Sequence, residues 1–367
     1  MKEPAGGGAA IPDIVRRGFA PALIAWQRHS GRHGLPWQGT RDPYRVWLSE
    51  IMLQQTQVAT VLAYYPRFLS RFPDVRALAD AAEDEVMALW SGLGYYSRAR
   101  NLHRCARAVA DGHGGVFPSS AEGLAALPGI GASTAAAIAA FCHGERVSIV
   151  DGNVRRVLSR LLAFEEDLAQ ARPQQRLWGL AQSLLPETPD HADMQAYTQG
   201  LMDLGATVCT RTRPACVLCP VNGLCRARAD GDPVRYPVKS RRMVRRHESW
   251  WLSVMLRGEG AQRQVWLQRR PAPGIWAGLQ CVPVADSESA ALAGVPADGG
   301  PVRELPAIVH ALTHRELRLH PLVVELPAAG IAPAADGAWH AMSHLDGIGL
   351  PAPIRLLLTG GLRQLSG

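Results

Sequence analysis

The sequence predicts a multidomain protein with an all-α core followed by a smaller α+β domain. Apolar residues recur at helical spacing in the first part of the chain, and no alternating strand pattern occurs before about residue 249. Four cysteines lie together in one short loop near the middle. A stretch rich in Pro, Gly and Arg then separates this loop from segments with the two-residue alternation of strands.

Composition indicates an intracellular protein that binds a polyanion. The 367 residues suffice for two or three domains, and 47% of them are hydrophobic. The net charge is +7, but residues from 248 onward hold nine Arg and no Lys against ten Asp and Glu. The basic charge therefore lies before residue 248, and a basic surface of this kind favours nucleic acid.

Several classes of protein are disfavoured. No apolar run approaches the roughly 20 residues that span a membrane, and residues 1–12, beginning MKEPAGGGAA, lack the apolar centre of a signal peptide. We expect this lead-in to be disordered. Seven cysteines, four of them close together, do not resemble the disulfide framework of a secreted protein. The expected location is the cytoplasm.

The first two helices are predicted from capping and periodicity. Residues 13–30 place Val15, Phe19 and Leu23 on one apolar stripe. The second helix is predicted over 42–58 and begins at Asp42, whose side chain can cap free N–H groups. Glu50 lies among the apolar residues of this helix, so its pKa should rise and suit a general acid. Alternatively, Glu50 belongs to a polar face with Gln54.

Further helices surround two glycine-containing turns. A helix from 82 to 90 leads into the turn SGLGYY at 91–96, and a basic helix follows. In the motif LPGIG, Gly129 and Gly131 bracket one apolar residue before an Ala-rich helix. Backbone N–H groups at such a helix start favour a phosphate. A structural turn between two helices is the alternative.

Asp151 is a second candidate carboxylate. It lies 20 residues beyond Gly131, after a short apolar run and directly before a helix with apolar periodicity. The simplest role is an N-cap. A carboxylate at a helix start is also held ionised, so Asp151 can serve both as cap and as a catalytic group in a cleft.

The strongest chemical signal is the spacing C-x6-C-x2-C-x5-C, formed by Cys209, Cys216, Cys219 and Cys225. Four thiolates so close together bind an iron–sulfur cluster or zinc. Zinc sites usually pair two C-x2-C units, and one is present here, which favours [4Fe-4S] with zinc as the alternative. Arg211 and Arg213 lie in the first interval and could face a phosphate.

The C-terminal part begins after a basic linker at 226–247. Segments 249–258 and 263–270 are predicted to be paired strands, and 274–284 and 317–326 further strands. A closing helix is expected within 349–358.

The motifs WLSEIMLQQTQVAT, GLGYYSRARNLH, LPGIG and VDGNVRRVLSRL, followed by the four-cysteine loop, together resemble the adenine DNA glycosylases of the MutY type. These belong to the helix-hairpin-helix superfamily, which also holds endonuclease III. The resemblance runs from about residue 20 to 365. It implies a helix-hairpin-helix glycosylase core with a [4Fe-4S] loop and a C-terminal α+β Nudix-like domain. The implied divisions are 13–34 with 127–238 for the cluster module, 35–126 for a six-helix module, and 248–367 for lesion recognition.

The resemblance implies excision of adenine mispaired with 8-oxoguanine or guanine in double-stranded DNA, by a monomer at the bacterial nucleoid. Glu50 is then the general acid that protonates N7 of the flipped adenine. Asp151 stabilises the oxocarbenium-like sugar, as in two-carboxylate glycoside hydrolysis. Base flipping is needed because a stacked base is out of reach. Residues 280–300 lack an acidic metal-binding helix, so the C-terminal domain should bind DNA without hydrolysing nucleotides.

DNA contacts are also implied by the resemblance. Tyr95 matches the family's wedge beside the oxidised guanine, and Gln54 fills the gap beside the lesion pair. The segment Leu312-Thr313-His314 falls where the family has Phe-Ser-His, so the hydroxyl is kept and the aromatic ring is lost. The residues implied to contact DNA are Gln54, Tyr95, Gly129, Gly131, Ser133, Arg155, Arg211, Arg213, Thr313 and His314.

Ser133 separates the close relatives. Endonuclease III has a catalytic lysine at this position, and serine cannot form its Schiff base. The sequence therefore favours a monofunctional glycosylase over a bifunctional pyrimidine-lesion enzyme. Arg155 stands where some family members have Lys. Two other classes stay open, a non-catalytic DNA-damage sensor and a zinc-dependent transcription factor.

Overall fold

The computed structural model describes residues 11–240, 245–329, 333 and 336–361, and the chain folds as two compact units. Unit 1 comprises the described residues of 1–55 and 108–242, and unit 2 those of 56–107 and 243–367. Most of the predicted N-terminal lead-in, and residues 241–244 of the predicted linker, lie outside the described residues. No helix in the described part is long and apolar enough to cross a membrane.

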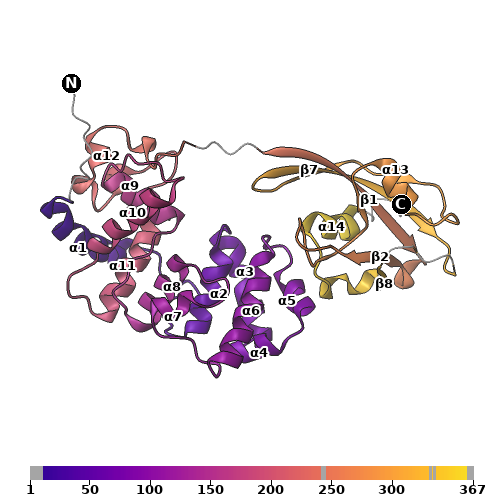
Figure 1. Ribbon diagram of the computed structural model, residues 1–367, viewed down its shortest axis with the longest axis horizontal. Helices are drawn as coiled ribbons and strands as arrows, with labels where there is room; N and C mark the ends of the chain where they lie inside the picture. Colours follow the sequence, from indigo (N-terminus) through magenta and orange to yellow (C-terminus); the bar gives the residue numbers. More distant parts are fainter. Residues whose placement is uncertain (1–10, 241–244, 330–332, 334–335, 362–367) are drawn as a thin grey trace. The chain divides into compact units, whose positions relative to one another are not determined.

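Unit 1 is helical (Figure 1). Its principal helices are α1 Asp13–Ser30, α2 Pro43–Leu53, α7 Ala121–Ala125, α8 Ala132–Ile138, α9 Gly152–Leu161, α10 Ala171–Ser183, α11 His191–Asp203 and α12 Arg226–Ala229. Shorter turns of 3-10 or π type are η1 Ala139–His143, η2 Leu204–Val208, η3 Cys216–Leu218, η4 Asn222–Leu224 and η5 Pro233–Arg235. The prediction of a first helix at 13–30 is confirmed. The prediction of a second helix over 42–58 is wrong for its last part, because α2 ends at Leu53 and Gln55 has a φ of +55°, which does not continue a helix.

The core of unit 1 forms where α1 packs against α11. Phe19 and Tyr197 meet edge to face, with 6.2 Å between ring centroids. Gly200 allows this approach, because a Cβ there would lie 3.1 Å from Leu23. Beyond the end of α1, Arg32 pairs with the buried Asp203 at 2.7 Å. These contacts explain why the N-terminal helix joins elements almost 200 residues later in the chain.

Part of the predicted linker belongs to unit 1. Ala227 and Tyr236 are buried, and the backbone N–H of Leu168 donates to the Val238 carbonyl at 3.2 Å. The sequence of this stretch is rich in Arg, so its composition does not indicate that a few apolar side chains attach it to unit 1.

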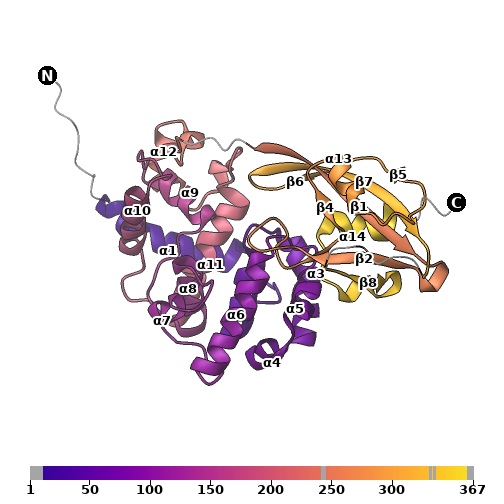
Figure 2. The same ribbon diagram turned by 45° about the vertical axis from the view of Figure 1, so that its right-hand side comes forward.

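Unit 2 combines helices with a sheet (Figures 1 and 2). The helices are α3 Val58–Arg71, α4 Val75–Asp80, α5 Glu83–Trp90, α6 Ser97–Gly112, which continues into unit 1, α13 Glu288–Ala293 and α14 Ala352–Leu356, with η6 Gly260–Gln262, η7 Met342–Gly347 and η8 Leu357–Gly361. The strands are β1 Arg246–Arg257, β2 Gln264–Arg269, β3 Gln280–Cys281, β4 Val284–Ala285, β5 Arg303–Glu304, β6 Ile308–Ala311, β7 Arg315–Leu326 and β8 Ala338–Ala341.

Within the described residues, eight strands form one sheet around a long parallel pair. β1 and β7 run parallel from the pair Arg246–Arg315 to the pair Arg257–Leu326. β2 pairs antiparallel with β1, which confirms the predicted strand pair. β6 and β7 form a hairpin whose tip holds Leu312, Thr313 and His314. The predicted closing helix is also confirmed, as α14 and η8.

The prediction of a strand over 274–284 is wrong for its first half. Gly274–Leu279 forms successive turns, in which the N–H of Ala277 donates to Gly274 and that of Leu279 to Trp276. Trp276 has a φ of +59° and Gly278 of +76°, neither of which fits a strand. The apolar alternation of this segment reflects burial of Trp276 and Leu279 inside a turn.

Candidate active site

Helix α2 presents Glu50 in its last turn. The carboxylate of Asp42 caps the helix, accepting from the Tyr44 N–H at 2.9 Å, and Pro43 takes the first position. The adjacent Ser49, Ile51 and Met52 are all buried. Glu50 keeps part of its surface exposed, whereas its carboxyl group is enclosed by protein atoms. The helix thus holds the carboxyl group of Glu50 beside buried residues that are mostly apolar.

Helix α9 places the second carboxyl group, Asp151, at its N-cap. Its Oδ1 accepts a hydrogen bond from the Val154 N–H at 2.7 Å, so the predicted capping role is confirmed. The preceding Ile149 and Val150 are buried, which fixes the entry of the chain into the helix. Asp151 itself is half-buried.

The two carboxyl groups influence each other. Loss of water around Glu50, and second the negative charge of Asp151, raise the pKa of Glu50 from 4.5 to about 8. Glu50 therefore keeps its proton at neutral pH and can donate it. The structure brings together a proton donor and a carboxylate, which is the pair that acid-assisted cleavage of a glycosidic bond requires.

The hairpin between α7 and α8 lies beside this pair. Gly129 has a φ of +77°, a backbone conformation that favours glycine, and Gly131 is the N-cap residue of α8. The Ser133 hydroxyl accepts from the Val150 N–H at 3.2 Å and so ties the hairpin to the residue before Asp151. Gln54 reaches the same helix, donating to the Thr134 hydroxyl at 3.4 Å.

The four cysteines of the central loop line one pocket in unit 1, together with Arg160 and Asn222. None of the four forms a disulfide. Burial and the neighbouring sulfurs raise the pKa of Cys219 to about 11, so a metal group must displace protons when it binds. The donor set fits a thiolate-bound metal group, either an iron–sulfur cluster or zinc.

The cysteines do not converge on a single point. Among the residues that the structure describes, no group of three or more His, Cys, Asp or Glu side chains is arranged to hold one metal ion.

Two arginines that the sequence analysis did not single out hold the cysteine loop. Arg160, which is 2% exposed, donates to the Cys209 sulfur at 3.3 Å and to the carbonyls of Thr210 at 2.7 Å and Arg211 at 2.8 Å. Arg156 donates to the Cys209 carbonyl at 2.8 Å. Their spacing of four residues places both side chains on one face of α9, and this spacing is the feature of the sequence that could have indicated a shared role. The helix that begins at Asp151 therefore also supports the cysteine loop.

A second group of predicted residues lies in unit 2. Tyr95 occupies the turn after α5, is 44% exposed and has a φ of +47°. Its hydroxyl and that of Thr313, at the tip of the β6–β7 hairpin, are 2.6 Å apart and share a hydrogen bond. His314 is exposed beside Thr313. The structure thus joins Tyr95 and Thr313, which are 218 residues apart in the sequence.

The remaining predicted DNA contacts are basic side chains of unit 1. Arg155 is half-buried on α9, and Arg211 and Arg213 are exposed in the cysteine loop. Their contact with DNA stays a prediction.

Comparison with protein-family models gives two matches. Residues 48–182 match the HhH-GPD superfamily of base excision DNA repair proteins, and residues 254–360 match the NUDIX domain. The first match includes Glu50, Asp151 and the hairpin between α7 and α8. The second includes the β6–β7 hairpin with Thr313.

Known proteins resemble most of the chain. The adenine DNA glycosylase of Buchnera aphidicola subsp. Schizaphis graminum is 32% identical over 347 residues, which cover 93% of this chain and 97% of that protein. The human adenine DNA glycosylase is 36% identical over 383 residues, covering 86% and 69%. A solved thermostable thymine-DNA glycosylase matches 59% of this chain and 98% of its own with a TM-score of 0.52 and 26% identity.

Proposed function

Because the chain belongs to the adenine DNA glycosylases of base excision repair, we propose that its substrate is adenine mispaired with 8-oxoguanine or guanine in double-stranded DNA. We further propose that it removes the base without cutting the strand. The observation that supports removal of the base most strongly is the pairing of Glu50, whose pKa is raised to about 8, with the nearby charge of Asp151.

The proposed reaction has two steps. The adenine is flipped out of the duplex, and Glu50 transfers its proton to N7, so that the bond from N9 to the sugar breaks and adenine leaves as a neutral base. The carboxylate of Asp151 stabilises the positive charge that develops on the sugar. Water then attacks the sugar carbon, and the carboxylate of Glu50 accepts its proton. Glu50 returns to its starting form.

Ser133 supports the monofunctional outcome. Strand cutting by a glycosylase of the lysine type proceeds through a Schiff base to the sugar, and this requires an amine. Ser133 offers only a hydroxyl, which accepts a hydrogen bond from the Val150 N–H at 3.2 Å. In this proposal Ser133 stabilises the hairpin against the segment that leads to Asp151.

Recognition of the opposite base is assigned to unit 2 in the same proposal. Tyr95 presents an aromatic ring that can wedge between bases, and Thr313 offers a hydroxyl 2.6 Å from the tyrosine oxygen. This pair supports the idea that one site reads the strand facing the adenine.

We also propose that the four cysteines hold a [4Fe-4S] cluster, with zinc as the alternative. Bound there, the cluster would crosslink the loop from Cys209 to Cys225. Arg160 and Arg156 would keep this loop attached to α9, and Arg211 and Arg213 would face the phosphate backbone. Substrate chemistry is left to the two carboxyl groups.

The test is single-turnover cleavage of a duplex with one adenine opposite 8-oxoguanine. Each time point is divided and loaded on a gel with and without prior alkali. Product that appears only after alkali is the expected result, since an abasic site survives until alkali cuts it. Product without alkali would contradict the monofunctional proposal. Absence of product in both halves, with binding intact, would favour a non-catalytic damage sensor.

A further inference from the structure

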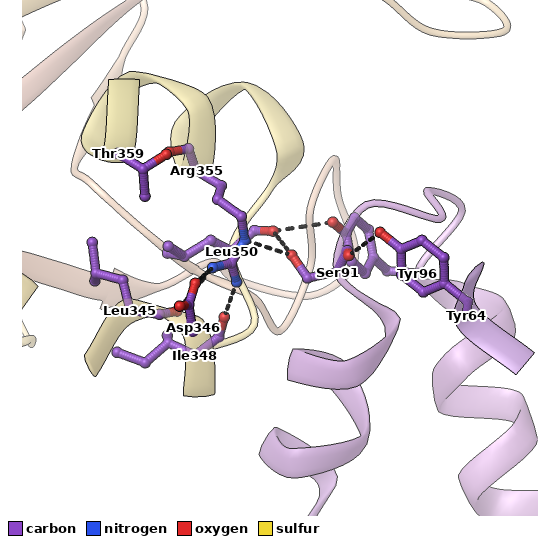
Figure 3. A network of polar contacts seen from close by, with 9 residues as sticks. All are labelled: Tyr64, Ser91, Tyr96, Leu345, Asp346, Ile348, Leu350, Arg355 and Thr359. Carbon is purple, nitrogen blue, oxygen red and sulfur yellow. Dashed lines mark hydrogen bonds and ion pairs between the residues drawn. The ribbon is translucent and has the colours of Figure 1, made fainter. Parts of the chain in front are cut away.

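The turn that presents Tyr95, residues 91–96, is hydrogen-bonded to the C-terminal segment 345–355, which holds Leu350 and Arg355 (Figure 3). Ser91, at the start of the turn, donates through its hydroxyl to the Leu350 carbonyl at 2.9 Å. The same hydroxyl accepts from Nε of Arg355 at 3.2 Å. Tyr96, at the end of the turn, donates to the same Leu350 carbonyl at 3.0 Å. Both ends of a six-residue turn thus meet one carbonyl more than 250 residues away.

Arg355 is fixed in its own part of the fold before it reaches Ser91. Its side chain is 22% exposed. Nη2 donates to the Ile348 carbonyl at 2.6 Å and Nη1 to the Leu345 carbonyl at 3.0 Å. These two bonds hold the planar guanidinium in one orientation and leave Nε directed at Ser91. Arg355 is therefore a rigid support for the turn.

The opposite side of the turn is equally restricted. The Tyr64 hydroxyl donates to the Ser91 carbonyl at 2.8 Å. Gly92 has a φ of +104°, and a Cβ there would lie 2.1 Å from the Tyr64 oxygen. Arg98 donates to the carbonyls of Leu93 at 3.0 Å and Gly94 at 3.1 Å. The backbone from 91 to 94 is thus held between α3, α6 and the C-terminal segment.

Tyr95 needs such support. Its φ of +47° is uncommon for a residue with a Cβ, and such conformations persist only where the surroundings determine them. Tyr95 is nonetheless 44% exposed, and the Arg98 guanidinium lies 5.5 Å from its ring centroid. The next residue, Tyr96, is buried, which raises the pKa of its hydroxyl and keeps it a hydrogen-bond donor.

We propose that Arg355 and Ser91 are positioning residues for Tyr95, so that the C-terminal segment sets how the opposite base is read. This rests on the proposed function. Thr313 contacts the tyrosine hydroxyl, whereas Arg355 acts from behind, through the turn. The C-terminal part of the chain would therefore contribute to recognition twice, once at a side chain that faces DNA and once through a network that does not.

The experiment measures single-turnover rate constants for adenine opposite 8-oxoguanine and opposite guanine, and takes their ratio. The variants are Ser91→Ala, which removes only the link, Arg355→Met, and Arg355→Lys as the conservative change. We expect the ratio to fall about fivefold in Ser91→Ala and Arg355→Met, which is within the range expected for the loss of one or two hydrogen bonds. Arg355→Lys should retain part of the ratio.

The matched control breaks another contact between the helical part and the sheet of unit 2. Arg269 and Asp84 form an exposed ion pair at 2.7 Å that joins β2 to α5 without touching the turn. Arg269→Gln should leave the ratio unchanged. A fall equal to that of Ser91→Ala would mean that the loss of any contact between the helical part and the sheet of unit 2 lowers the ratio, and would overturn the positioning role.

A Tyr95→Ala background supplies the second check. If Ser91 acts through Tyr95, adding Ser91→Ala there changes the ratio no further, because coupled residues are not additive. A further full fall would contradict the proposal, as would a normal ratio in both Ser91→Ala and Arg355→Met. Ser91→Ala keeps the proposal testable if Arg355→Met fails to fold. Failure of the wild-type chain to release adenine would instead overturn the proposed function.

Discussion

The two units differ in how far their candidate functional side chains are exposed to solvent. In unit 1 the Glu50 carboxyl is enclosed and Arg160 is 2% exposed beneath the cysteine loop. In unit 2 Tyr95 is 44% exposed and His314 is exposed. Bond cleavage needs a shifted pKa, which enclosure provides. Reading a base needs an exposed surface, and its precision must come from the network behind it. The comparison suggests that substitutions in unit 1 should change rates and those in unit 2 should change preference.

The largest expected effect is in unit 1. Glu50→Gln removes the transferable proton and keeps the shape, so the single-turnover rate constant should fall by about a thousandfold or more. Binding to duplex containing the mispair should persist, as measured by gel shift. Glu122→Gln, on the exposed face of α7, is the control. Near-normal turnover in Glu50→Gln would remove Glu50 from the mechanism.

Asp151 allows its cap and its charge to be separated. Asparagine caps helices about as well as aspartate, so Asp151→Asn should unfold at the wild-type temperature while its excision rate falls about a hundredfold or more. Asp151→Ala should lose activity and also about 1 kcal/mol of stability, because the Val154 N–H loses its acceptor. Thermal unfolding and single-turnover kinetics of both variants provide the measurement. Normal excision by Asp151→Asn would show that the charge is not needed.

Binding of the metal group should depend on the four cysteines that line the pocket and not on the other cysteines of the chain. Cys219→Ser is expected to lose bound iron, inorganic sulfide and visible absorption, and to unfold at a lower temperature. Cys142→Ser, at a buried cysteine outside the pocket, should keep all three metal signals. Zinc without sulfide in the wild-type protein would contradict the cluster assignment.

The smallest effect belongs to unit 2. Thr313→Val keeps the side-chain shape and removes the hydroxyl 2.6 Å from the Tyr95 oxygen. Preference for 8-oxoguanine over guanine should fall severalfold, the order of one hydrogen bond, with excision opposite guanine nearly unchanged. Thr313→Ser should restore the preference. If Thr313→Val slowed both substrates equally, the division of roles between the units would fail.

Local signals were sufficient for most elements of the fold. Asp42 and Pro43 indicate the start of α2, and the position of Glu50 among apolar neighbours predicts its raised pKa. The helix at 13–30 and the pairing of β1 with β2 also follow from periodicity. The segment from Gly274 to Leu279 misleads because a buried turn and a buried strand share the same apolar composition.

Long-range contacts could not be predicted in the same way. Nothing near Arg355 in the sequence indicates that its guanidinium reaches Ser91, 264 residues earlier. Arg160 lies between Ser159 and Leu161 on α9, and most of its partners are backbone carbonyls, which side-chain patterns in a sequence do not reveal. Contacts of this kind depend on tertiary packing alone.

The central claim is that an enclosed Glu50 supplies the proton, and its most direct test is the pH dependence of kcat/KM, which reports the free enzyme. Since the pKa of Glu50 is raised from 4.5 to about 8, the acid is protonated at neutral pH, and kcat/KM should fall as the pH rises through about 8. The free energy of unfolding should respond to the same group. The folded state holds this proton more tightly than the unfolded state does, so stability falls as the pH rises from 4.5 towards 8, and Glu50→Gln should remove that component. A kcat/KM that declines already near pH 4.5, or that does not decline through pH 8, would contradict the account.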